Sequence, residues 1–179
     1  MSAKSPRAAI KLVAEDLQAA ASCVTRSVLR AEIVTGDATR ATIGFAGAPR
    51  ARAGKAQQRW ISINVAVVAT QDDPSGAWRT HTSLYDFSLY EHPIEGDFSL
   101  AYHFHPSPDG RGHTEPHLHV GAQPSWGRGL KKKHLPTGRI SAEDFVRLLI
   151  EELDIGRQRS DWAKVLSRGE QRFAERRTW

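Results

Sequence analysis

An alternation of large apolar residues with small or polar ones between positions 61 and 67 constrains this chain more than any other feature. The apolar residues stand at every second position, at Ile61, Ile63, Val65 and Val67. Successive side chains of a strand point to opposite faces, so this segment is predicted to be a half-buried β-strand. A strand with one apolar face needs other parts of the chain to cover that face.

Apolar residues at helical spacing predict this cover at the two ends of the chain. One long helix is expected over residues 6–30, with Ser5 as its N-cap and a proline at the first helical position. Two more helices are expected over residues 141–176, the first capped by Ser141. The acidic residues of that first C-terminal helix are expected on its solvent face: Glu143, Asp144, Glu151, Glu152 and Asp154.

The remaining segments predict a sheet between these helices. Besides the strand at 61–67, strands are expected at residues 41–45, 78–90, 98–105 and 117–120. The connections are of hairpin length, which favours an antiparallel sheet of about five strands and an α+β fold. The expected parts of the single domain 1–179 are a mobile basic loop at 44–59, a histidine-rich sheet at 60–120 and a second basic loop at 121–139.

The composition excludes several classes of protein. Of the 179 residues, 40% are hydrophobic and 25% are charged, which is typical of a globular domain and not of a collagen or a disordered chain. The single cysteine, Cys23, excludes an internal disulfide and favours a reducing, cytoplasmic environment. No apolar run reaches the length of a membrane span, so no membrane partner is expected.

The charge balance indicates the kind of partner. Lysine and arginine number 25 and aspartate and glutamate 20, which gives a net charge of +5 with histidine neutral. The sequence pI is near 9.7. An excess of positive charge favours an anionic partner, and nucleic acid is the first candidate.

Two His-x-His pairs are the strongest candidates for chemistry. They are His103 with His105 and His117 with His119. Strand alternation places the members of each pair on one face, opposite Phe104. If the two strands pair antiparallel, their side chains lie about 5 Å apart, and the four imidazoles converge.

Three interpretations of these histidines compete. In the first, which we prefer, the imidazoles act as general acid and general base on a phosphodiester, without a metal or other cofactor. In the second they bind a divalent transition metal such as zinc or manganese. In the third they do no chemistry, and the protein is a module that binds nucleic acid or a protein partner. A carboxylate that orients an imidazole would have to come from Asp86, Asp109 or Glu115.

A group of basic and aromatic residues follows the second His-x-His pair. We interpret it as a nucleic-acid-binding group that consists of Trp126, Arg128, Lys131, Lys132, Lys133, His134 and Arg139. The cations would attract phosphates, and the indole would stack on a base.

Three runs within residues 78–155 resemble the TumE-type toxins of bacterial toxin–antitoxin systems. The runs are YHFHP at 102–106, PHLH at 116–119, and KHLPTGRIS at 133–141, followed by an acidic helix. This resemblance implies a small α+β protein with an RNA-directed toxic activity and a cognate antitoxin. Together with the histidines it predicts a ribonuclease-like hydrolase of a toxin–antitoxin or defence system, acting on RNA or another nucleic acid.

Overall fold

The predicted antiparallel sheet is present, and it has more strands than expected. The computed structural model describes residues 3–54, 59–71, 76–94, 96–106, 114–121 and 135–175. Within these residues one sheet of eight strands runs in the order β1-β2-β4-β5-β6-β7-β8, and β3 also pairs with β4. All the pairings are antiparallel, so the α+β prediction is confirmed.

The elements follow one another in an order that puts helices at both ends of the chain. The strands are β1 (Leu29–Val34), β2 (Asp37–Phe45), β3 (Ala51–Ala53), β4 (Arg59–Thr70), β5 (Arg79–Tyr90), β6 (Phe98–Phe104), β7 (His117–Val120) and β8 (Leu135–Pro136). The helices are α1 (Pro6–Ala21), α2 (Ala142–Glu151) and α3 (Trp162–Glu175).

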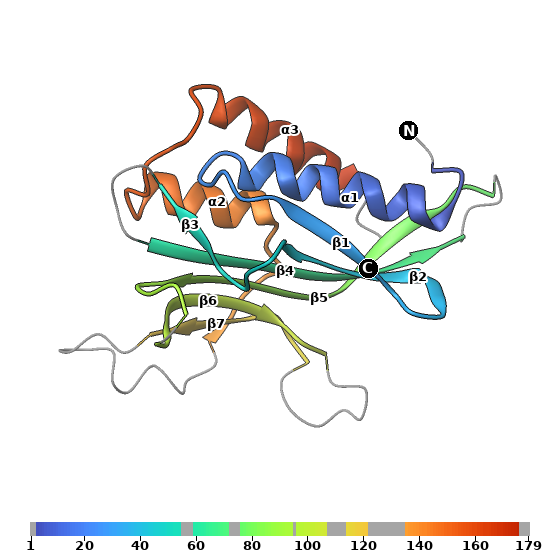
Figure 1. Cartoon of the computed structure of the whole chain (residues 1–179), viewed down its shortest axis with the longest axis horizontal. Coiled ribbons are helices and arrows are strands. Elements are labelled where there is room, and N and C mark those ends of the chain that lie inside the picture. The colour runs from blue at the N-terminus through green and yellow to red at the C-terminus, as the bar shows by residue number, and fades with distance from the viewer. Residues whose placement is uncertain are drawn as a thin grey trace.

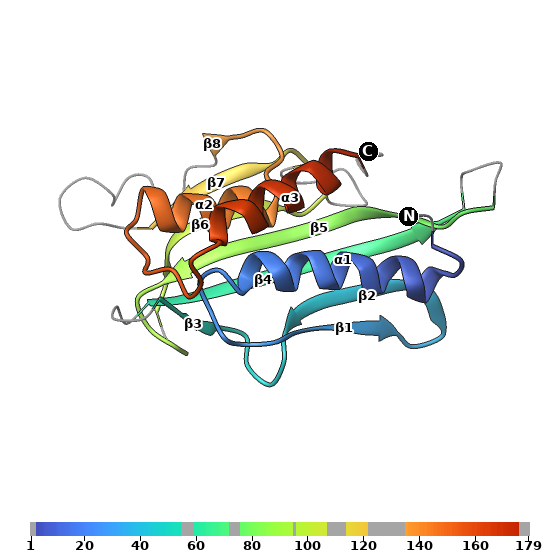
Figure 2. The same cartoon turned by 90° about the horizontal axis from the view of Figure 1, so that it is seen from above.

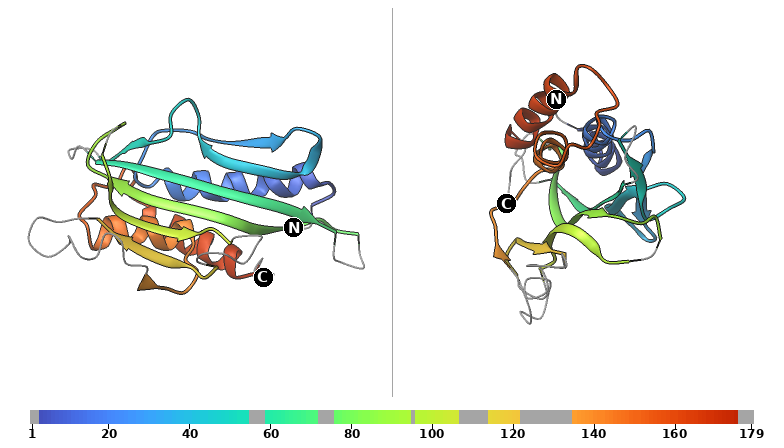
Figure 3. Two further views of the ribbon diagram at one scale, coloured as in Figure 1. Left: turned by 90° about the horizontal axis from the view of Figure 1, so that it is seen from below. Right: turned by 90° about the vertical axis from the view of Figure 1, so that its left-hand side faces the viewer.

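All three helices lie on one face of the sheet. Figure 1 shows α1, α2 and α3 on the same side of the strands, and the view from above in Figure 2 shows α1 running along the sheet beside α2 and α3. The opposite face, on which none of the described helices lies, is seen from below in Figure 3. Alternate residues of the central strands, such as Ile63 and Phe87, face the helices. They form the core together with helix residues such as Phe145.

The first helix is shorter than the expected 6–30, because residues 22–28 form a turn and an irregular connection and residues 29–30 begin a strand. Ser5 caps the helix and accepts a hydrogen bond from the backbone N–H of Ala8. The helix ends at Ala21. From Leu29 onward buried and exposed residues alternate with a period of two, which is the pattern of a strand. Gln18 joins the two elements, since its side-chain oxygen accepts a 2.7 Å hydrogen bond from the Leu29 N–H.

The expected mobile loop at 44–59 is partly a strand. Ala51 and Ala53 are buried, and this short strand pairs with β4 in the register Ala51 to Ile61. The backbone groups of this short strand form hydrogen bonds with β4, and the local sequence does not predict that pairing. Residues 55–58 of the expected loop lie outside the described part of the chain.

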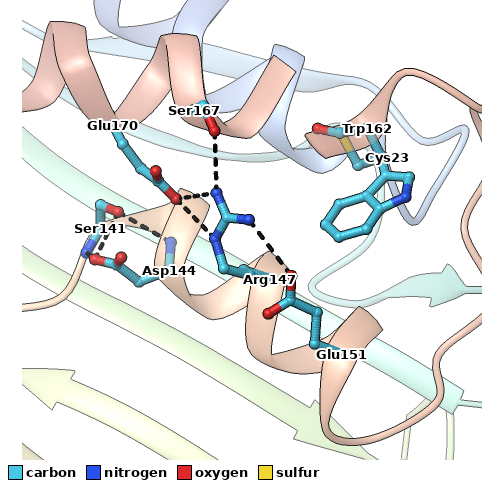
Figure 4. A network of polar contacts seen from close by, with 8 residues as sticks. All are labelled: Cys23, Ser141, Asp144, Arg147, Glu151, Trp162, Ser167 and Glu170. Carbon is cyan, nitrogen blue, oxygen red and sulfur yellow. Dashed lines mark hydrogen bonds and ion pairs between the residues drawn. The ribbon is translucent and has the colours of Figure 1, made fainter. Parts of the chain in front are cut away.

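The two C-terminal helices are joined by a polar contact that involves Arg147 of α2. Its guanidinium donates to Glu170 of α3 at 2.6 Å and to Glu151 at 3.5 Å, as Figure 4 shows. In the same view Ser141 and Asp144 form the reciprocal cap at the start of α2. The predicted Ser141 cap is therefore confirmed.

One expectation for α2 is wrong. The sequence pattern places Glu143 on the solvent face with the other acidic residues, but only 4% of its surface is exposed. It stands at the second position of the helix, where the chain turns inward, and α3 packs over it at Gly169. The spacing of residues in α2 carries no information about α3, so it does not predict that Glu143 is buried.

Within the described residues, no helix combines the length and apolar character that crossing a membrane requires.

Candidate metal and acid–base site

The two His-x-His pairs come together on the face of the sheet opposite the described helices. β6 and β7 pair antiparallel, with His103 opposite His117 and Ala101 opposite His119. Phe104 belongs to the core on the other face. The predicted convergence of the imidazoles on one face is thus confirmed.

The register extends this arrangement across four strands. Asn64 of β4 pairs with Asp86 of β5, Asp86 pairs with His103 of β6, and His103 pairs with His117 of β7. Because paired residues share a face, these four residues form one polar row across the sheet.

A second row runs beside the first and contains smaller residues. Ser62 pairs with Ser88, Ser88 with Ala101, and Ala101 with His119. Ser88 and Ala101 are fully buried, which leaves the larger imidazoles above them. The small side chains of this row thus provide the floor of the site.

Three of the imidazoles are close enough to share one ion. His103, His117 and His119 each offer a ring nitrogen, and these atoms all lie within 4.8 Å of one another. Ligand nitrogens around a tetrahedral zinc ion, at about 2.0–2.1 Å from the metal, lie roughly 3.4 Å apart. Small rotations of the side chains would bring the three nitrogens to that spacing, so the donor set fits a transition metal.

One ring nitrogen of His117 and one of His103 lie close to oxygen acceptors. Nδ1 of His117 is 2.8 Å from the carbonyl oxygen of Glu115, to which it donates. Nε2 of His103 is buried without a well-aligned hydrogen bond, and Oδ2 of Asp86 lies 3.4 Å from it. Metal-binding histidines commonly make such contacts to a backbone carbonyl and a carboxylate.

The carboxylate of Asp86 accepts hydrogen bonds from two serine side chains. Ser88 donates to Asp86 Oδ1 at 2.5 Å, and Ser62 donates to the same oxygen at 3.5 Å. Burial favours a higher pKa for Asp86, but the contacts with His103 and Ser88 and the nearby imidazoles outweigh it and lower the pKa. Asp86 is therefore an ionised carboxylate next to His103.

His105 is close to the other three but does not join them. Its ring stacks on that of His103, with 5.0 Å between the centroids, and the residue is exposed beyond the end of β6. Burial and the charges of His103 and His117 lower the pKa of His105, against the opposing effect of Asp86.

The histidine face is more covered than the sequence predicts. Strand parity indicates that the residues on this face point outward, yet only 6% of His117 is exposed. Phe98 contributes to this cover, since its ring meets those of His103 and His119 edge-on, at 6.0 and 5.7 Å. The sequence places Phe98 with the core residues on the other face.

A bulge explains the position of Phe98. In the pairing of β5 with β6, Leu89 is opposite Leu100 but Tyr90 is opposite Phe98, so no residue of β5 is paired with Ser99. One extra residue reverses the alternation, which moves Phe98 to the histidine face. Strict parity cannot predict such a bulge.

Of the predicted nucleic-acid-binding residues, Arg139 alone belongs to the described part of the chain. Trp126, Arg128, Lys131, Lys132, Lys133 and His134 lie outside the described residues. Arg139 is described, and its guanidinium carbon lies 4.3 Å from the ring centre of Phe104. Because Phe104 is on the helix-covered face, Arg139 is not brought to the imidazoles.

Three residues of the site were not singled out by the sequence, namely Asn64, Ser62 and Ser88. Their positions in the alternating segments at 61–67 and 78–90 placed them on the polar face. The missing information was the register, which decides which polar residue lies beside which histidine.

Comparisons with models of protein families, with curated proteins and with solved structures found no match to this chain.

Proposed function

We propose that the protein is a metal-dependent hydrolase in which His103, His117 and His119 bind a divalent transition metal, zinc or manganese being the first candidates. One observation carries this proposal: the three ring nitrogens lie within 4.8 Å of one another. Three imidazoles in such an arrangement are a donor set that suits these metals. A bound metal of this kind lowers the pKa of a coordinated water and supplies a nucleophile at neutral pH.

The residues around the three ligands would each have a separate task. Asp86 and the Glu115 carbonyl orient the rings of His103 and His117 and make them better ligands. His105, which is exposed beside His103, is placed to contact a substrate rather than the metal. Phe98 excludes water from one side of the imidazoles.

The substrate that we propose is a nucleic acid, and the bond that is hydrolysed is its phosphodiester. The net charge of +5 supports an anionic substrate, and the resemblance to TumE-type toxins supports RNA. In this proposal the cell would also contain a cognate antitoxin or another protein partner.

A metal-free phosphodiesterase is the second candidate. The observation that favours it is the close pair of His103 and Asp86, at 3.4 Å, with His105 stacked on the same imidazole. A carboxylate-oriented imidazole beside a second one is also an arrangement for general acid and base catalysis.

Metal analysis and chelation separate the two candidates. The full chain, purified and then loaded with Zn²⁺ or Mn²⁺, should retain about one ion per protein and should cleave a labelled single-stranded RNA. A chelator should abolish the cleavage, and the added metal should restore it. Cleavage that survives complete removal of the metal would favour the acid–base mechanism.

Histidine variants test the assignment of the ligands. His103→Ala and His119→Ala should lose both the bound metal and the cleavage, whereas His105→Ala should keep the metal. His92→Ala is the matched control, because His92 is an exposed histidine on the β5–β6 connection. Metal retained by the His119 variant, or lost from the His105 variant, would contradict the ligand set.

The lysine run tests the substrate class. Replacement of Lys131, Lys132 and Lys133 by alanine should weaken RNA binding and flatten its dependence on salt. Three phosphate contacts correspond to a change of roughly 2 in the slope of log affinity against log salt for a single strand. An unchanged slope would remove this run from the binding surface.

A further inference from the structure

A cavity on the opposite, helix-covered face of the sheet has no part in the proposed function. It lies where α1, α2 and α3 meet β4 and β5, and its volume is about 80 Å³. Its apolar lining includes Val13 and Leu17 of α1, Val65 of β4 and Phe87 of β5. Such a surface favours an apolar group of the size of a short alkyl chain.

A buried carboxyl group lies in this apolar cavity. Glu143, at the start of α2, lines the cavity and is only 4% exposed. α3 makes room for it with Gly169, since a Cβ atom at that position would lie 2.7 Å from Glu143 Cγ. Any other residue at position 169 would push the carboxyl group away, so the two helices pack specifically around this group.

The other charged side chain that lines the cavity is also acidic. Asp16 of α1 lines the same cavity, but it is already paired with Arg172 of α3 at 2.7 Å. Within the described residues no ion pair to Glu143 is found, and no basic side chain lines the cavity. The other polar residues that line the cavity are Ser141, which caps α2, and Thr80, Thr82 and Tyr85 of β5. The carboxylate of Asp144 lies near Glu143 on the same helix.

The protonation of Glu143 reflects this environment. Burial raises the pKa of Glu143 to about 7, and the charges of Asp16 and Asp144 add to the rise, although a hydrogen bond with Ser141 opposes it. A buried carboxylate is stabilised when a cation replaces the water that it has lost. The cavity thus offers an apolar wall and, at one end, a carboxyl group that gains from a positive partner.

We propose that this cavity binds a small aliphatic amine, with its ammonium group paired to Glu143 and its alkyl chain against the walls formed by α1 and β5. An anionic ligand is disfavoured because both carboxyl groups of the cavity would repel it. A purely polar ligand is disfavoured because it would leave its hydrogen bonds unmet against Val13, Leu17 and Val65. This site lies on the opposite face of the sheet from the histidines. The amine-binding proposal does not depend on the proposed hydrolase activity.

Three ligands of the same length test the proposal: n-butylamine, n-butanol and butyrate. Each is titrated into the full chain at pH 8 with a chelator present, so that the amine cannot bind a metal. Methyl NMR signals of Val13, Leu17 and Val65 report occupation of the cavity, and those of the exposed Val34 and Ile94 serve as remote references. We expect saturable shifts for butylamine, with at least tenfold weaker binding of butanol and no binding of butyrate. Equal binding of the amine and the alcohol, or no shift with the amine, would overturn the proposal.

Two further measurements assign the effect to Glu143. Glu143→Gln should abolish the preference for the amine, whereas Glu152→Gln, a change of an exposed acid at the end of α2, should keep it. In the unmodified protein the amine should bind more weakly as the pH falls below about 7, by up to tenfold for each pH unit, because Glu143 must then release a proton. An amine preference that survives the Glu143→Gln substitution, or that ignores pH, would refute the role of Glu143.

Discussion

The two faces of the sheet each carry an ionisable site, but the two sites arise in different ways. On the open face, three imidazoles and Asp86 come from consecutive strands that are held in register. On the covered face, Glu143 stands alone at the start of a helix, and its surroundings come from α1, α3 and β5. The comparison teaches that a polar cluster on a sheet follows from local alternation, whereas a buried acid on a helix depends on how distant elements pack.

Removing a core side chain should have the largest effect and should separate the two faces most clearly. Phe104 is 5% exposed and its ring lies 5.8 Å from that of Tyr85, so Phe104→Ala should cost about 3–5 kcal/mol of unfolding free energy. His105→Ala, one residue further on and exposed, should change it by no more than about 0.5 kcal/mol. Urea unfolding of both variants measures this, and equal losses would contradict the assignment of the two faces.

The buried acid should make stability depend on pH in a defined direction. The pKa of Glu143 is about 7 in the folded chain against a reference of 4.5, so folding favours its protonated form. This contribution is fully present below pH 4.5 and is lost as the pH rises through 7. The loss amounts to about 1.4 kcal/mol for each pH unit that separates the two pKa values.

Glu143→Gln should therefore be more stable than the unmodified protein at pH 8, by up to about 3 kcal/mol. At pH 4.5 the two proteins should be of similar stability. Thermal or urea unfolding at the two pH values checks this, with Glu152→Gln as the exposed control. If the Glu143→Gln variant gains nothing at pH 8, the ionised carboxylate of Glu143 does not destabilise the folded chain.

The carboxylate of the open face should act on metal affinity rather than on the fold. Asp86→Asn keeps the shape of the side chain but removes the negative charge beside His103, and it should weaken metal binding by about 10–100-fold. Competition with a metal indicator measures the affinity. An unchanged affinity would show that Asp86 does not position His103.

The smallest effect on metal affinity is expected at Ser88, which contacts Asp86 and not a metal ligand. Ser88→Ala removes the 2.5 Å hydrogen bond to Asp86 and leaves Ser62 at 3.5 Å as the remaining donor on that oxygen. Metal affinity should fall by a few-fold, less than for Asp86→Asn. Ser83→Ala, which removes a hydrogen bond to the Ala66 carbonyl elsewhere on β5, should leave it unchanged.

Much of the histidine site could be predicted from the sequence, because it depends on the period of a strand. The alternation at 98–104 and 117–120 placed His103 and His117 on one face, opposite Phe104. The position of Phe98 could not be predicted, since a single residue that is not paired with β5, Ser99, reverses the parity.

The fold was predictable in class but not in its boundaries. The α+β class follows from helical patterns at the ends and alternating patterns between them. β1 was missed although Leu29, Ala31 and Ile33 alternate with polar residues, because the expected helix was continued to residue 30, over the start of this strand. β3 was missed because its three residues gain their hydrogen bonds from β4.

The division of the helical cover between the two ends of the chain has a consequence for folding. α1 is made first and α2 and α3 last, yet all three lie on the same side of the sheet, with α3 packed against α1 and α2. During synthesis the apolar side of β4 and β5 therefore stays only partly covered until the final helix has left the ribosome. Contacts between α1 and α3 join residues as far apart as Asp16 and Arg172, and such long loops close slowly. A growing chain of this kind exposes a sheet surface for most of its synthesis, which makes the addition of α2 and α3 the step that protects it from aggregation.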